Sequence, residues 1–182
     1  MRSVCSCWRE GCQTWREVID RAQFSPDGIN HPFPIPIGPD ATIPTENIAY
    51  LLADLLETSG DVLLLGTGSG YETAILAERC RSVISVESQP IAVRQPMPAN
   101  VVLFQADAYD FMTSNEFDGI LVSFGTNRLS PNWIEQLRQG GRLVVPILIG
   151  SSCRITVYER HGDSLLLVDA IAWAPFTKAV EA

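Results

Sequence analysis

The pattern of hydrophobic and polar positions changes period along the chain. Between residues 45 and 58 the apolar residues recur with helical spacing, at Ile48, Leu51, Leu52, Leu55 and Leu56. This spacing predicts an amphipathic helix. The next apolar run, residues 62–65 after Asp61, is continuous, which is typical of a strand buried on both faces in a parallel sheet.

Short apolar runs then alternate with helical stretches. Further strands are predicted at residues 83–86, 101–104, 117–123 and 142–149, and helices at residues 71–80 and 131–139. Two last strands, residues 154–160 and 165–173, flank the turn 161–164 and read as an antiparallel hairpin. We therefore expect a doubly wound α/β fold with a mostly parallel seven-stranded sheet and a C-terminal antiparallel hairpin.

The organisation along the chain predicts one domain with an N-terminal arm. A length of 182 residues fits a single domain of ordinary size. Residues 1–40 show no period and end in a proline-rich run, residues 30–39, where fixed φ angles favour an extended path. We expect an irregular arm over residues 1–40 and a single domain over residues 41–182.

Charge and composition exclude some classes of partner. Thirteen Lys and Arg residues against 21 Asp and Glu give a net charge of −8, so a broad basic face for duplex nucleic acid is not expected. The chain has neither the apolar run needed to span a bilayer nor a secretory signal at Met1, which predicts a cytoplasmic protein without membrane contact. The sequence indicates no oligomeric state.

Three cysteines lie close together near the start of the chain, at Cys5, Cys7 and Cys12. They fit either a zinc site or incidental thiols. The only histidines, His31 and His161, are far away in sequence. We expect no metal site.

The loop with Gly66, Gly68 and Gly70 stands between the first buried strand and the next helix. Glycines there let the backbone approach a ligand, and the helix N-terminus offers free N–H groups to an anion. The same glycines also suit a plain tight turn. The third glycine comes one residue too early for the dinucleotide pattern, and no Lys-Ser or Lys-Thr pair follows, which argues against a nicotinamide cofactor and excludes a P-loop.

Two acidic residues are predicted at the carboxyl edge of the same sheet. Glu87 ends the second strand, near the spacing at which an acid meets ribose hydroxyls in such folds, and Asp107 follows the third strand. Alternatively, Glu87 is a solvated carboxylate at the end of a strand, and Asp107 is the N-cap of a helix.

With these residues the chain resembles the protein-L-isoaspartate O-methyltransferases, a family of class I S-adenosylmethionine-dependent methyltransferases. The first motif of that family resembles residues 61–77, DVLLLGTGSGYETAILA. Further similar segments follow in the family's order over roughly residues 30–176: Pro36-Ile37-Gly38, Ala41-Thr42-Ile43, residues 117–122, residues 134–146 and Ala174-Pro175-Phe176.

The resemblance implies a Rossmann-like methyltransferase fold and S-adenosyl-L-methionine as cofactor. It implies that residues 66–70 hold the methionine part, Glu87 the ribose, and Asp107 with Ala108 the adenine. The candidate cofactor residues are Gly66, Thr67, Gly68, Ser69, Gly70, Tyr71, Glu87, Ser88, Asp107, Ala108 and Ser123. Thr42 and Thr45 are the candidates for orienting the acceptor carboxylate, and each is alternatively a cap of the helix at residues 45–58.

The chain departs from the family pattern at four places. The family's Thr-Ile-Ser signature ends in Pro44, which has neither a hydroxyl nor an N–H. Leu64 stands where the first motif usually has an acid, which removes a charged contact near the cofactor. Residues 88–100, where a crossover helix is usual, contain three prolines, and the N-terminal arm is shorter than is typical.

The leading functional prediction is a carboxyl O-methyltransferase acting on L-isoaspartyl residues in proteins or peptides, and hence in protein repair. A second interpretation, favoured by Pro44, keeps the cofactor and takes another small-molecule or peptide acceptor. A third, favoured by Leu64, is a catalytically silent binding module. The fold alone does not choose among them.

Overall fold

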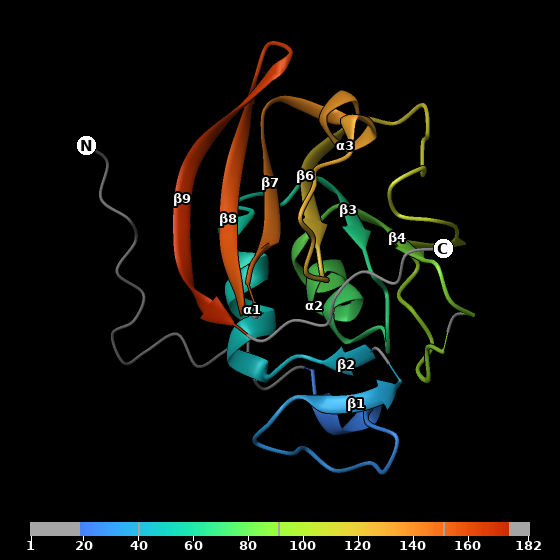
Figure 1. The fold of residues 1–182 in the computed structure, drawn as a ribbon. Coiled ribbons are helices and arrows are strands. Elements are labelled where there is room, and N and C mark those ends of the chain that lie inside the picture. Colours follow the sequence, from blue (N-terminus) through green and yellow to red (C-terminus); the bar gives the residue numbers. More distant parts are fainter. Residues whose placement is uncertain (1–18, 40, 91, 151, 175–182) are drawn as a thin grey trace, which may run out of the picture.

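A seven-stranded sheet forms the centre of the molecule (Figure 1). The structure is a computed structural model that describes residues 19–39, 41–90, 92–150 and 152–174. In chain order the strands are β3 (Asp61–Leu65), β4 (Ser82–Glu87), β5 (Val101–Gln105), β6 (Phe117–Val122), β7 (Leu137–Ile149), β8 (Ser152–His161) and β9 (Ser164–Ala174). Their order across the sheet is β5-β4-β3-β6-β7-β8-β9.

The pairing of these strands confirms the predicted fold class. Strands β5, β4, β3, β6 and β7 run parallel to one another, and β8 pairs antiparallel with β7. Strands β8 and β9 form the C-terminal antiparallel hairpin. The chain builds the sheet outwards from β3 to β5, returns, and then builds from β6 towards β9, so the order reverses between β3 and β6.

Strand β3 divides the core into two buried clusters because successive side chains point to opposite faces. Val62 and Leu64 pack with the helices α1 (Glu46–Leu55) and α2 (Tyr71–Arg79) on one face. Leu63 and Leu65 pack on the other face with Trp133 of the short helix α3 (Pro131–Glu135). The continuous apolar run in the sequence reflects this burial on both sides.

The predicted helix over residues 131–139 is wrong beyond Glu135. Helix α3 has only five residues, and strand β7 already begins at Leu137, which is fully buried and pairs with Phe117. The Gln136 side chain donates to the carbonyl oxygens of Phe111 and Asn132 and so holds the helix end in place. Pairing with β6 therefore overrides the helical pattern.

Two further segments bear on the sequence predictions. The described part of residues 88–100 contains no helix, as its prolines indicate. The described part of the arm, by contrast, is not all irregular. It contains the 3₁₀-helix η2 (Arg21–Phe24) and the strand β1 (Ile35–Gly38), which pairs antiparallel with β2 (Ala41–Ile43).

The cysteines Cys5, Cys7 and Cys12 lie outside the described residues.

The buried side chain of Arg21 fastens the arm to the junction between β2 and α1. Only 2% of Arg21 is exposed. Its guanidinium donates to the carbonyl oxygens of Ile43 and Pro44, at 3.2 and 2.8 Å. It also donates to three oxygens of the arm, the carbonyls of His31 and Phe33 and the side chain of Asn30. A buried guanidinium needs several acceptors at once, so these bonds fix the path of both segments.

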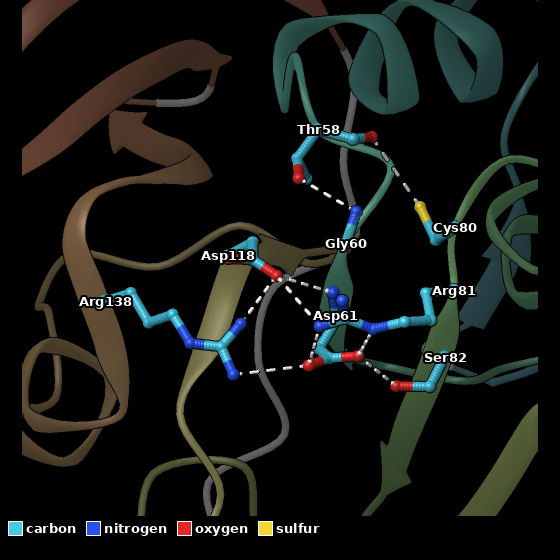
Figure 2. Close-up of polar contacts among 8 residues, drawn as sticks. All are labelled: Thr58, Gly60, Asp61, Cys80, Arg81, Ser82, Asp118 and Arg138. Carbon is cyan, nitrogen blue, oxygen red and sulfur yellow. Dashed lines mark hydrogen bonds and ion pairs between the residues drawn. The ribbon is translucent and has the colours of Figure 1, made fainter.

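A cluster of charged side chains joins four strands at the amino edge of their parallel part (Figure 2). The Arg138 guanidinium donates to Asp118 and Asp61 at 2.6 and 3.2 Å. Asp61 also accepts from Arg81 and from the Ser82 hydroxyl, each at 2.8 Å. These bonds tie the starts of β3, β4, β6 and β7 together, at the opposite end of the strands from the glycine loop.

Replacement of Gly60 by alanine is expected to disrupt this cluster. A Cβ at Gly60 would lie 2.0 Å from Asp118 Oδ2 and 2.5 Å from its Cγ, so the carboxylate must move away from Arg138. We expect Gly60→Ala to lower the free energy of unfolding by about 1 to 3 kcal/mol, measured by urea denaturation. The control is Gly38→Ala, whose Cβ would meet only Ala41 Cβ, at 4.0 Å. Equal stability of the two variants would contradict the role given to the cluster.

The same cluster predicts a pH dependence of stability. The hydrogen bond from Arg81 foremost, and those from Ser82 and Arg138, hold the pKa of Asp61 well below its ordinary value. A carboxyl whose pKa is lowered by folding stabilises the native state above its unfolded pKa, near 4, and loses that contribution as the pH falls through the folded pKa. Asp61→Asn should therefore lower the free energy of unfolding by about 1 to 2 kcal/mol at pH 7.

The difference in Tm between the parent chain and Asp61→Asn should shrink as the pH falls below about 4. Thermal unfolding followed by circular dichroism from pH 7 to pH 2 measures this difference. Asp54→Asn is the matched control, because Asp54 is 64% exposed in its pair with Arg79 and such pairs contribute little. A constant difference across the pH range would argue against the assignment.

Candidate functional site

A cavity of about 330 Å³ lies at the carboxyl ends of β3, β4 and β6, with β1 and β2 at its side. A cavity of this size suits a small-molecule ligand. Its lining includes eleven of the thirteen residues predicted from the sequence: Thr42, Gly66, Thr67, Gly68, Ser69, Tyr71, Glu87, Ser88, Asp107, Ala108 and Ser123. Gly70 and Thr45 are not among the lining residues.

The glycine loop turns sharply between β3 and α2. Gly66, Gly68 and Gly70 have φ angles of +100°, +51° and +89°, a region that favours glycine. Gly66 N–H donates to the Val86 carbonyl at 2.8 Å, and Gly70 is the N-cap of α2. Gly70 thus shapes the turn without lining the cavity, while Gly66 and Gly68 present backbone to it.

The two acids predicted at the sheet edge, Glu87 and Asp107, both line the cavity. Both also accept hydrogen bonds from backbone N–H groups. One Glu87 oxygen accepts from Gly68 N–H at 2.8 Å, and the other accepts from Gln89 N–H at 3.1 Å. Asp107 accepts from Tyr109 N–H at 2.6 Å and so caps a turn rather than a helix. Each carboxylate has acceptor capacity left for a ligand.

The two threonines predicted to orient an acceptor lie in different places relative to the cavity. Thr42 lies in β2, is paired with Pro36 of β1, and lines the cavity. Thr45 is the N-cap of α1, makes no capping bond with its side chain, and lies outside the lining. Pro44 lines the cavity, and its carbonyl accepts from Arg21.

The sequence interpretation missed Glu72, the second residue of α2. Glu72 lines the cavity and is 6% exposed. Its Oε2 accepts from the Ser123 hydroxyl, and its Oε1 is buried without a hydrogen-bond partner. Burial raises the pKa of Glu72 to about 7, against the lowering effect of Ser123. A carboxylate directly after a glycine loop was the available signal, but its inward direction was not visible in the sequence.

Other missed residues supply the apolar surface of the cavity. Aromatic side chains come from Tyr109 and Phe124, whose rings lie 6.0 Å apart. Further lining residues that were not predicted are Ile37, Gly38, Pro39, Ala41, Ile43, Val86, Gln89, Pro90 and Ala92. Leu64 is fully buried in the core and does not line the cavity. None of the described lining residues is Lys, Arg or His.

Comparison with known proteins assigns the chain to a family. The sequence profile described as protein-L-isoaspartate(D-aspartate) O-methyltransferase matches residues 13–181. The chain is 34% identical to the protein-L-isoaspartate O-methyltransferase of Opitutus terrae, over 88% of this chain and 76% of that protein. It is 38% identical to protein-L-isoaspartate O-methyltransferase 1 of Syntrophobacter fumaroxidans, over 63% of this chain and 58% of that protein.

The fold is similar to that of a solved member of the same family. A Plasmodium falciparum structure titled as a protein-L-isoaspartate O-methyltransferase, in complex with S-adenosyl-L-homocysteine, aligns with a TM-score of 0.73 and 18% identity. The alignment covers 88% of this chain and 85% of that one. It supports the Rossmann-like methyltransferase fold that the family resemblance implies.

Replacement of Gly68 by valine is expected to weaken cofactor binding. A β-branched residue at φ +51° is strained by about 1 to 3 kcal/mol, and the loop moves away from the cavity to relieve that strain. We expect at least about tenfold weaker binding of S-adenosylmethionine by titration calorimetry.

The matched control is Gly162→Val. Gly162 has φ +61° and no atom within 4 Å of an added Cβ, in the turn between β8 and β9. This variant should show a similar loss of stability with unchanged cofactor affinity. Equal affinity of both variants for the cofactor would refute the role of the glycine loop.

Proposed function

The chain belongs to the protein-L-isoaspartate O-methyltransferase family, whose members use S-adenosylmethionine, and from this premise we propose that it methylates the free carboxylate of L-isoaspartyl residues in proteins or peptides. The observation that carries the proposal is the cavity at the carboxyl edge of the sheet, which joins the glycine loop to the β1–β2 wall. One side of the cavity suits the cofactor and the other suits the acceptor.

The residues of the cavity fit a positively charged nucleoside cofactor. Three carboxylates and no basic side chain are among the described lining residues. Glu72 has an unpartnered buried oxygen, and the glycine loop leaves backbone exposed to the cavity. We assign residues 66–70 to the methionine part, Glu87 to the ribose, and Asp107 with Ala108 to the adenine, with Tyr109 and Phe124 as aromatic surface.

When bound, the cofactor supplies a methyl group on a sulfonium sulfur. The acceptor needs no general base, because a carboxyl with pKa near 3.5 to 4 is already ionised at pH 7. The protein has to hold that carboxylate in line with the methyl carbon and keep water away from it. We assign the orientation to the Thr42 hydroxyl, and the exclusion of water to Ile37, Ile43 and Pro44, which line the same side.

Isoaspartyl proteins or peptides are the proposed partners, and a cytoplasmic location stays a prediction. None of the helices in the described part of the chain is long and apolar enough to cross a membrane. Pro44 lines the acceptor side without a hydroxyl, which favours a different small-molecule or peptide acceptor as the second candidate function.

A methyl-transfer assay tests the proposal. The chain should transfer methyl to an isoaspartyl peptide and not to its aspartyl counterpart. Thr42→Val should lower kcat/KM for the isoaspartyl peptide by about five- to thirtyfold, since it removes one hydrogen bond to the carboxylate, while cofactor affinity stays unchanged.

The matched control is Thr45→Val, because the Thr45 hydroxyl neither lines the cavity nor caps α1. This variant should keep the parent kcat/KM. Intact cofactor binding without transfer to the isoaspartyl peptide would reject the repair function and leave another acceptor as the better account.

A further inference from the structure

Glu72 is a buried carboxylate at the wall of the cavity with one oxygen satisfied and one free. The side chain comes from the first turn of α2, directly after the glycine loop. Oε2 accepts from the hydroxyl of Ser123, which follows β6. Oε1 is inaccessible to solvent and has no hydrogen-bond partner among the described residues. The two oxygens therefore have different surroundings.

No basic side chain is among the described residues that line the cavity beside this carboxylate. Burying an ionised carboxylate without a partner is costly, and a buried acceptor that lacks a donor loses about 1 to 3 kcal/mol or more. None of the described lining residues carries a positive charge, and Glu87 and Asp107 line the same cavity. A ligand with a cationic donor is the partner that satisfies such a site.

We propose that Glu72 binds the α-ammonium group of the methionine part of the cofactor through Oε1, and that Ser123 positions the carboxylate for this contact. The inference rests on the proposed cofactor site. It adds to that site a charged contact on the methionine part, supplied by α2.

The ammonium is favoured over the sulfonium by hydrogen-bond chemistry. The free oxygen of Glu72 needs a donor, and an ammonium has three N–H groups whereas a sulfonium has none. Glu72 also follows the glycine loop, to which the methionine part is assigned. The Ser123 hydroxyl already donates to Oε2, which leaves Oε1 as the oxygen that lacks a donor.

The protonation of Glu72 provides a second way to detect the contact with the ammonium group. Burial raises its pKa to about 7 in the free protein, so an ammonium partner must lower that pKa and release protons on binding. The other ionisable groups around it are Tyr71 beside it, Glu46 of α1 near Tyr71, and Glu87, Asp107 and Tyr109 at the cavity. A variant without the Glu72 carboxyl separates its protons from theirs.

Calorimetric binding of three ligands tests the contact. S-adenosylmethionine carries both cationic groups, S-adenosylhomocysteine keeps only the ammonium, and 5′-methylthioadenosine has neither. Glu72→Gln should weaken the binding of S-adenosylmethionine and S-adenosylhomocysteine by roughly ten- to a hundredfold, which corresponds to the loss of a charged hydrogen bond. It should change the affinity for 5′-methylthioadenosine by less than about twofold. Glu78→Gln removes the same charge from an exposed position of the same helix and should change none.

The outcomes separate the possible failures. A loss of affinity for S-adenosylmethionine alone would assign Glu72 to the sulfonium and overturn the ammonium contact. An equal loss for all three ligands would make Glu72 a structural residue. Unchanged binding in Glu72→Gln, with normal binding by the parent chain, would reject this inference alone. A parent chain that bound none of the three ligands would reject the proposed cofactor site as well.

Proton release provides a second test, whose first measurement uses the parent chain. At pH 6.5 the free ligand's α-amino group, with a pKa near 8, is already protonated. Titration with S-adenosylhomocysteine in buffers of different ionisation enthalpy should then show release of about half a proton or more per ligand. Glu72→Gln should lose this release. Proton uptake, or no exchange, in the parent chain would overturn the proposal.

Discussion

The reversal of strand order between β3 and β6 is the constraint on which the rest of the site depends. The chain builds β4 and β5 on one side of β3 and then places β6 and β7 on the other. The connections after β3 and β6 therefore leave in opposite directions, and a crevice opens at their carboxyl ends. The glycine loop follows β3 and Ser123 follows β6, so both reach this crevice from strands that are direct neighbours.

The two edges of the parallel sheet serve different purposes. At the amino edge, charged side chains bond to one another, and Asp61 and Asp118 have their partners in Arg81 and Arg138. At the carboxyl edge, acids line a cavity that has no Lys, Arg or His among its described lining residues, and Glu72 keeps an oxygen without a partner. Satisfied charges hold strands together, whereas an unsatisfied one is retained at a cost that a ligand can remove.

The arm contributes to the site through one buried side chain. Arg21 gathers carbonyl oxygens from the arm and from Ile43 and Pro44, and β1 pairs with β2. This arrangement holds Thr42 at the cavity and fixes the backbone where the family's serine is replaced by Pro44. The β1–β2 side of the cavity, the proposed acceptor side, thus depends on a residue far from it in sequence, while the proposed cofactor side is formed by the ends of the strands.

The sequence by itself determined the order of strands and helices, the glycine loop and eleven of the cavity residues. The elements and the glycine loop follow from local period and chain order, and Glu87 and Asp107 from the rule that parallel strands end at one edge. The other cavity residues were implied by the resemblance to the family. Only the tertiary structure decided which threonine faces the cavity, where α3 ends, what Arg21 binds, and that Glu72 points inward without a partner. Those outcomes are set by contacts between segments distant in sequence, for which the one-dimensional pattern carries no signal.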